Sequence, residues 1–185
     1  LAGVIRIITV PPVMVIGLLL ILYFCSPQPF GTLPELLIAI LLLGLVPVLA
    51  YPSQPLFPRY RQKGREGQRE LAFVFTGVGY TIAFLWALLA GVSPAVRTVC
   101  AGYFFSALLL TLCNKVLHRR ASGHACSAAG PLLFLIYYFG WWMLLPSIVI
   151  AALIAWASVT LRRHTPTDLL WGTLCSVVGF AIAVL

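Results

Sequence analysis

The chain has 185 residues, of which 62% are hydrophobic and 9% are charged, and its mean hydropathy is +1.05. Soluble domains carry roughly 25% charged residues, so this composition excludes a soluble globular protein and predicts one that crosses a membrane several times. The formal net charge of +8 does not indicate a nucleic-acid partner, because the cations lie in short segments beside apolar stretches, where anionic lipid headgroups are the better match.

Seven apolar stretches are long enough to be transmembrane helices. In chain order they cover residues 4–24, 34–51, 71–91, 96–114, 124–139, 141–161 and 167–185. Because hydrocarbon offers the backbone no hydrogen-bonding partner, each stretch must form a helix, and the alternating pattern of barrel strands is absent. We therefore predict an all-α fold, a polytopic membrane bundle of six to seven transmembrane helices, in which residues 1–185 form a single membrane-embedded domain.

The first apolar stretch has Arg6 near its start and Pro11-Pro12 inside it. Proline removes a backbone donor and bends a helix. The stretch also lacks the basic region and the small-residue cleavage site of a secretory signal peptide. We interpret it as a retained, kinked helix.

The longest polar segment runs from Tyr51 to Glu70 and separates the second stretch from the third. We interpret it as a solvated loop, and the alternative is that Arg65 or Arg69 overhangs a site on this side of the membrane. Its five cations are Arg59, Arg61, Lys63, Arg65 and Arg69.

Acid–base chemistry is confined to two further segments, which precede the fifth and seventh stretches. The first runs from Lys115 to His124, and the second runs from Arg162 to Asp168, the only aspartate in the chain. With the segment 52–70, they connect the second helix to the third, the fourth to the fifth and the sixth to the seventh. A seven-helix path therefore places all three segments on one side of the membrane, and we expect their side chains to converge.

Both segments end in helix-start signals. Ser122 is the expected N-cap of the fifth helix, and Gly123 lets an anion approach the first-turn N–H groups. Thr165, followed by proline, is the expected N-cap of the seventh helix, so His164 precedes that helix and Asp168 lies in its first turn. The alternatives are structural: a capping box formed by Asp168, buried histidines, and arginines that anchor the chain at the interface. Ionisable side chains at membrane depth are functional by default, which favours a site.

These residues resemble the motifs of the type 2 phosphatidic acid phosphatase superfamily, integral-membrane lipid phosphatases with the pattern KxxxxxxRP, PSGH and SRxxxxxHxxxD. Ser122-Gly123-His124 matches the core of the second part, and His164 to Asp168 matches the end of the third. The resemblance covers about residues 96–185. Lys115 matches the lysine of the first part, but the Arg-Pro pair that should follow is missing.

Two other positions depart from the family pattern. Ala121 replaces the proline before Ser-Gly-His, and Ala157-Ser158 replaces the Ser-Arg pair. Arg162 lies one helical turn after Ser158 and is expected to replace the missing arginine, because helical side chains lean toward the N-terminus. Arg163 is the alternative, since it is adjacent to His164.

The resemblance implies phosphoryl transfer without a metal or cofactor. His164 would attack phosphorus and form a phosphohistidine, Asp168 would orient the imidazole, and His124 would protonate the leaving lipid oxygen and then activate water. The implied substrate is a membrane lipid with a terminal phosphate or diphosphate, such as phosphatidic acid, phosphatidylglycerol phosphate or a polyprenyl phosphate. The implied phosphate-binding residues are Lys115, Arg119, Arg120, Ser122, Gly123, Arg162 and Arg163.

A non-catalytic protein of the same fold that binds or transports a lipid phosphate is the main alternative. A metalloenzyme fits less well, because the five cysteines are scattered without CxxC spacing and the nearby cations would repel a metal ion. An intramembrane serine protease lacks the nucleophile elbow. For orientation, we place the five cations of segment 52–70 on the motif side and Arg6 and Arg97 on the other. The positive-inside rule then predicts a cell-membrane protein with its site at the cytoplasmic face.

Overall fold

The computed structural model describes residues 1–185 and contains helices but no strand, which confirms the predicted all-α fold. Two π-helical segments, η1 (Ile40–Leu45) and η3 (Leu112–Val116), and two 3-10 segments, η2 (Gln54–Leu56) and η4 (Trp141–Met143), extend or join the α-helices. The α-helices are α1 (Ala2–Ile8), α2 (Pro11–Cys25), α3 (Leu33–Ala39), α4 (Val46–Ser53), α5 (Pro58–Arg61), α6 (Gly64–Leu89), α7 (Pro94–Thr111), α8 (Gly123–Phe139), α9 (Leu144–Thr160) and α10 (Pro166–Val184).

Five continuous helical runs are long and apolar enough to cross a membrane. They are Leu33–Leu56, Gly64–Leu89, Pro94–Val116, Trp141–Thr160 and Pro166–Val184. The pair α1 and α2 is bent by 56° and makes a sixth candidate if it counts as one span, while α8 is apolar but shorter. The bend lies at Pro11-Pro12, where a kink was predicted, because Pro11 begins α2 and cannot continue the hydrogen bonding of α1.

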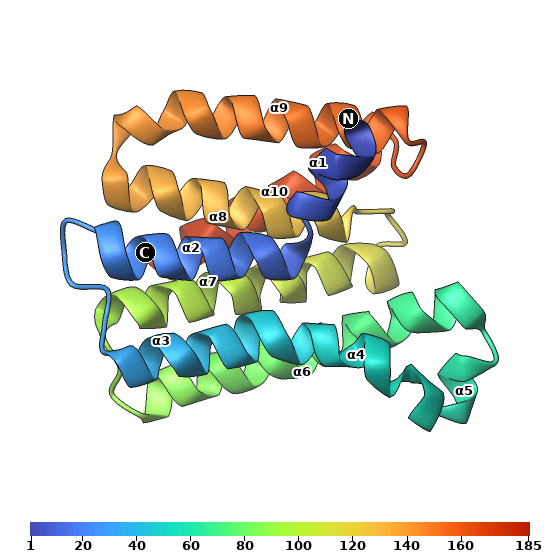
Figure 1. Cartoon of the computed structure of the whole chain (residues 1–185), viewed down its shortest axis with the longest axis horizontal. Coiled ribbons are helices and arrows are strands. Elements are labelled where there is room, and N and C mark those ends of the chain that lie inside the picture. Colours follow the sequence, from blue (N-terminus) through green and yellow to red (C-terminus); the bar gives the residue numbers. More distant parts are fainter.

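The segment 52–70 is mostly helical, which corrects its interpretation as a loop. It contains η2, α5 and the first two turns of α6. The side-chain amide of Gln54 donates hydrogen bonds to the carbonyls of Tyr60 (3.1 Å) and Gly64 (2.7 Å). Tyr60 lies at the end of α5 and Gly64 at the start of α6, so these bonds tie η2 to both helices, and the polar segment folds back as a short helical hairpin at the end of the bundle (Figure 1).

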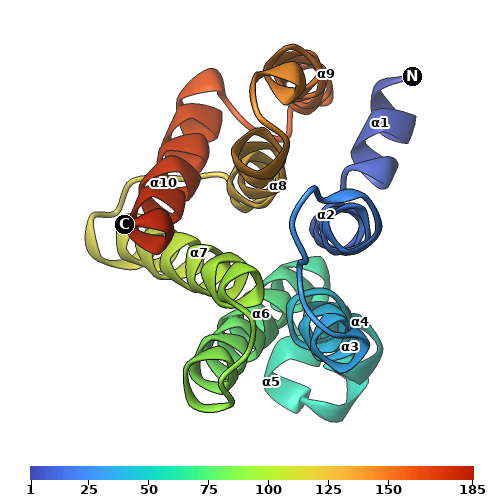
Figure 2. The ribbon, with the colours of Figure 1, turned by 90° about the vertical axis from the view of Figure 1, so that its left-hand side faces the viewer.

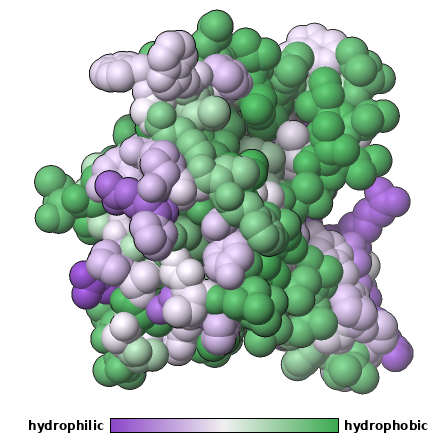
Figure 3. Space-filling model, turned by 60° about the vertical axis from the view of Figure 1, so that its left-hand side comes forward, coloured by the Kyte–Doolittle hydropathy of each residue, from purple (hydrophilic) through white to green (hydrophobic).

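The helices pack in two groups with α2 and α7 between them, as the view along the bundle shows (Figure 2). The main core lies among α2, α3, α6, α7 and α8 and includes the fully buried Leu19, Val99 and Phe134. Large apolar side chains also cover much of the outside (Figure 3). An apolar exterior around a packed interior is the arrangement that a lipid environment favours.

The start of α10, the loop before α8 and the short helix α1 all lie at one end of the bundle (Figure 1). Helix α10 reaches this position because it packs closely on α7. Gly179 faces Ser106 of α7, and a Cβ added at Gly179 would lie 2.5 Å from the Ser106 nitrogen. Small residues at membrane-helix contacts allow such a close approach.

We predict that Gly179→Ala lowers the apparent melting temperature of the detergent-purified protein, followed by intrinsic fluorescence. The added methyl group overpacks the α7–α10 contact, which costs about 1–3 kcal/mol of stability. Gly17→Ala is the matched control, because a Cβ at Gly17 meets no atom within 4 Å, and removing a helical glycine stabilises by about 0.5–1 kcal/mol. Equal shifts in the two variants would contradict the close packing of α7 on α10.

Candidate functional site

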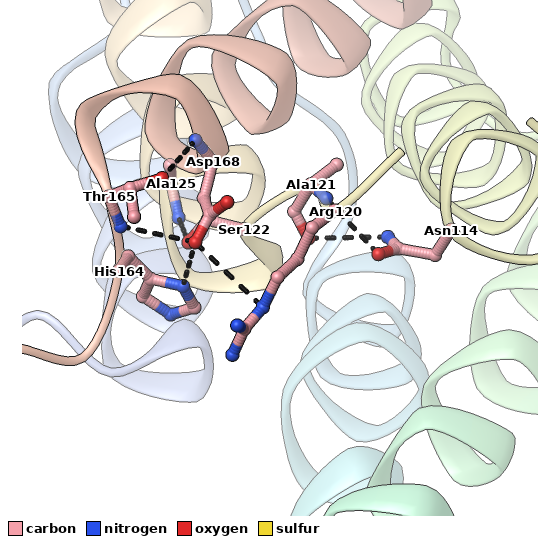
Figure 4. A network of polar contacts seen from close by, with 8 residues as sticks. All are labelled: Asn114, Arg120, Ala121, Ser122, Ala125, His164, Thr165 and Asp168. Carbon is pink, nitrogen blue, oxygen red and sulfur yellow. Dashed lines mark hydrogen bonds and ion pairs between the residues drawn. The ribbon is translucent and has the colours of Figure 1, made fainter. Parts of the chain in front are cut away.

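The start of α8 is fixed by two polar side chains. The Ser122 hydroxyl accepts a hydrogen bond from Ala125 N–H (3.2 Å), which confirms Ser122 as the N-cap. Before it, the side chain of Asn114 bonds both backbone groups of Ala121: its amide donates to the carbonyl (3.2 Å), and its oxygen accepts from the N–H (3.1 Å). The loop between η3 and α8 is thereby held against the end of α7 (Figure 4).

The start of α10 is a complete capping box. The Thr165 hydroxyl accepts from Asp168 N–H (3.2 Å), and Asp168 Oδ2 accepts from Thr165 N–H (3.1 Å). The predicted N-cap at Thr165 is therefore confirmed, and Asp168 does form a capping box. Asp168 has contacts beyond the cap, because the same Oδ2 lies 3.7 Å from Nδ1 of His164 and 3.9 Å from Nε of Arg120 (Figure 4).

One backbone hydrogen bond joins the two segments. Ser122 N–H donates to the Asp168 carbonyl over 2.8 Å, although these residues lie 46 positions apart in the sequence. Gly172 of α10 permits the contact, because a Cβ there would collide with the Ser122 carbonyl. The two segments that resemble family motifs therefore meet, as the seven-helix path predicts.

His124 and His164 line the same cavity, whose volume is about 750 Å³. Gly123, Arg120 and Arg163 line it from the same two segments, and Arg6 and Arg69 line it from α1 and α6. No aspartate or glutamate is among the lining residues. The deeper walls are mostly apolar and aromatic, and they include Val13, Val48, Phe73, Tyr80, Tyr103, Phe134 and Phe180. The cavity thus joins a cationic end to an apolar interior.

The remaining predicted site residues lie outside the cavity lining. Ser122 and Asp168 are buried behind it, where they cap helices. Lys115, Arg119 and Arg162 are exposed and do not line the cavity. The structure therefore does not bring all seven predicted phosphate-binding residues to the cavity.

The helical-phase argument for Arg162 is wrong, because α9 ends at Thr160. Arg162 has a left-handed backbone (φ 51°), and the turn closes with hydrogen bonds from Arg162 N–H to the Val159 carbonyl (2.9 Å) and from Arg163 N–H to the Ser158 carbonyl (3.0 Å). This is a Schellman turn. It places the backbone of Arg163 beside Ser158, the position at which the family pattern has arginine, and the Arg163 side chain lines the cavity.

Two residues of the N-terminal segment reach the site and were not predicted to do so. Arg6 lines the cavity, and the Thr9 hydroxyl lies 3.4 Å from Nε2 of His124. The placement of Arg6 on the opposite side from the motifs is therefore wrong. Counting spans gives the reason: in a seven-helix path, the first apolar stretch begins on the side to which the second, fourth and sixth connections return.

The surroundings of His164 favour the neutral form of its imidazole at physiological pH. Burial and the nearby positive charge of Arg6 lower its pKa from the ordinary value of 6.5, and Asp168 only partly opposes them. A neutral imidazole retains the lone pair that a nucleophile requires.

We expect the pKa of the His164 ring to lie below 6.5 in a ¹⁵N NMR titration of the detergent-solubilised protein. Asp168→Asn should lower the pKa of His164 further, because a negative charge that favours the imidazolium is removed. Arg120→Gln should raise the pKa of His164, because the positive charge of Arg120 disfavours the imidazolium. The signal is assigned by its loss in His164→Ala, and a pKa above 6.5 in the parent protein would contradict the electrostatics of the site.

Comparisons of the chain with protein-family models, curated proteins and solved structures give no match. A proposal about function must therefore rest on the motif resemblance of the two short segments and on the geometry that brings them to one cavity.

Proposed function

We propose that the chain is a metal-independent membrane lipid phosphatase, which hydrolyses a terminal phosphate monoester or diphosphate through a phosphohistidine intermediate. One observation carries the proposal: His124, His164 and four arginines line one end of a cavity whose other walls are largely apolar and contain no carboxylate. The type 2 phosphatidic acid phosphatase motifs supply the reaction class, and the cavity supports the class of substrate.

The cavity suits an amphiphile with an anionic headgroup. Guanidinium groups bind phosphate oxygens through charged, paired hydrogen bonds, and the aromatic walls beyond them favour an acyl or prenyl chain. A soluble phosphate ester would fill only the cationic end. This division supports a lipid phosphate over a water-soluble one, and phosphatidic acid, phosphatidylglycerol phosphate and polyprenyl phosphates all satisfy it.

His164 is the proposed nucleophile, and its orientation suggests which nitrogen reacts. Asp168 lies beside Nδ1, so it favours the tautomer that carries its proton there and leaves the Nε2 lone pair free. The Nε2–phosphorus bond forms as the phosphorus–oxygen bond to the lipid breaks, and His124 gives a proton to the departing oxygen. Water then attacks phosphorus, His124 takes its proton, and the nitrogen–phosphorus bond breaks to release inorganic phosphate.

Arginines take the part that a metal ion has in other phosphoryl-transfer sites. Arg120 and Arg163 belong to the motif segments, and both line the cavity with His164. Fixed cations next to the transferred group stabilise charge as it redistributes in the transition state. We therefore expect hydrolysis to proceed in the presence of EDTA.

We expect His164→Ala, His124→Ala and Asp168→Asn each to abolish most phosphate release from a panel of lipid phosphates, measured in detergent with EDTA. His164→Ala should lose most, more than about 10⁴-fold, because the nucleophile is gone. His124→Ala should lose about 10²–10⁴-fold, the usual contribution of general acid–base catalysis. His118→Ala is the matched control, since His118 is exposed and outside the cavity lining. Near-parental turnover by His164→Ala would exclude the mechanism.

The alternative function, binding or transport of a lipid phosphate without hydrolysis, is separated from catalysis by trapping. A substrate labelled with ³²P in its terminal phosphate should leave acid-labile, base-stable label on the parent protein and none on His164→Ala. Saturable binding of the same lipid without label transfer or phosphate release would instead favour the alternative.

We also propose seven crossings of the cell membrane, with the site at the cytoplasmic face. Five runs qualify by length and composition, and the proposal adds α1–α2 and α8. An odd number agrees with the termini at opposite ends of the bundle (Figure 1). The five cations of segment 52–70 and Arg6 lie at the site end, which leaves Arg97 for the other end. The difference in positive charge between the two ends is therefore larger than predicted from the sequence.

Single cysteines test this orientation in a Cys25→Ser background, since the other four cysteines are buried. Gln28→Cys reports on the α2–α3 connection, and Gln62→Cys reports on the opposite end; both native side chains are exposed. A membrane-impermeant maleimide should label Gln28→Cys on intact cells and Gln62→Cys only after permeabilisation. The reverse pattern would place the site outside.

A further inference from the structure

The short helix α1 contributes an arginine that no other residue neutralises. Arg6 lines the cavity, and its buried guanidinium nitrogen Nη1 has no hydrogen-bonding partner. No carboxylate lies within ion-pair distance of it, since the three ion pairs of the structure involve Lys63, Arg120 and His164. Buried polar groups are normally hydrogen-bonded, and the free guanidinium nitrogen belongs to a side chain that lines the cavity, so it is available to bind an anionic ligand there.

The surroundings of Arg6 are positive. Its guanidinium is repelled by Arg163 and Arg69, and its charge also acts on both His124 and His164. Gathering like charges at a partly buried place is unfavourable unless an anion joins them. A phosphoryl group carries the charge and the acceptor oxygens that would satisfy these guanidinium groups together.

A second contact ties the same segment to the site. The Thr9 hydroxyl donates its hydrogen to the Ile5 carbonyl (2.7 Å), and its oxygen, 3.4 Å from Nε2 of His124, can accept from that nitrogen when it carries a proton. The bend between α1 and α2 therefore lies against the histidine that is proposed to transfer protons. This places α1 at the reacting groups independently of the charge of Arg6.

We propose that Arg6 is a phosphate-binding residue of this site, and that it supplies, together with Arg163, the guanidinium that the motif lacks at Ser158. The inference rests on the proposed function for the identity of the ligand and extends it to a helix outside the motif-bearing part of the chain. Helix α1, which packs against α9, then forms one wall of the active site.

Binding of inorganic phosphate tests the inference without relying on turnover. Isothermal titration of the detergent-purified protein with phosphate should give a dissociation constant roughly 10- to 100-fold higher for Arg6→Gln than for the parent, the range expected when a hydrogen bond to a charged group is lost. Arg97→Gln is the matched control, because Arg97 is exposed at the opposite end of α7 and does not line the cavity, and it should bind phosphate as the parent does. An affinity of Arg6→Gln within twofold of the parent overturns the inference.

A measurement on the parent protein keeps the test decisive if Arg6→Gln does not fold. Phenylglyoxal modifies accessible arginines, and mass spectrometry reports the rate at each position. Phosphate should slow the modification of Arg6 at least severalfold and leave that of Arg97 unchanged. Equal rates at Arg6 with and without phosphate overturn the inference.

The two proposals fail in different ways. If the parent protein binds phosphate through Arg6 but releases none from any lipid, the phosphatase function is wrong and the Arg6 site stands. If the parent protein is active and Arg6→Gln binds phosphate normally, the function stands and the role of Arg6 is wrong.

Discussion

The hydrogen bond from Ser122 N–H to the Asp168 carbonyl, 2.8 Å long, is the contact on which the site depends. It joins the first residues of α8 and α10, and every motif side chain is positioned relative to one of these two helix starts. The bond requires that α10 come close to the loop before α8, which Gly172 permits. Because backbone atoms form the joint, the side chains of His124, His164 and Arg120 are left free to face the cavity.

In the proposed function, the buried carboxylate of Asp168 serves both the fold and the reaction. Its Oδ2 caps α10 by accepting from Thr165 N–H, and it also lies near His164 and Arg120. The capping bond fixes the carboxylate before any ligand arrives, so its position relative to the imidazole costs little further ordering. In the proposed reaction, this preorganisation matters because the imidazole becomes positive as it attacks phosphorus. The helix cap and the proposed orientation of the imidazole are therefore compatible, because the same carboxylate oxygen makes both contacts.

The sequence predicted the all-α fold and the helix starts at Ser122 and Thr165 correctly, because both follow from local rules. Hydrocarbon leaves the backbone no alternative to helix, and the Ser122 and Thr165 caps depend on residues one turn away. The errors arose where contacts between distant segments decide the outcome. Gln54 folds segment 52–70 into a helical hairpin by reaching Tyr60 and Gly64. The turn after α9 redirects Arg162, whose left-handed backbone no helical phase could anticipate. Arg6 was placed on the wrong side although the seven-helix path already puts the start of the first helix on the motif side, so this error did not come from a limit of the sequence.

The absence of arginine at Ser158 has a steric counterpart in the structure. Ser158 is only 1% exposed, and its carbonyl accepts the hydrogen bond that closes the turn before His164. A long side chain at position 158 would have to displace the residues that pack around it. Helix α1 packs on α9 and carries Arg6, and the turn that Ser158 closes carries Arg163. A small residue at position 158 therefore leaves room for an arrangement in which two guanidinium groups approach the cavity from neighbouring backbone segments. If the proposed function is right, the small residue at position 158 and the bent N-terminal segment act together, because the cavity receives Arg6 and Arg163 where the resembled motif would supply one arginine.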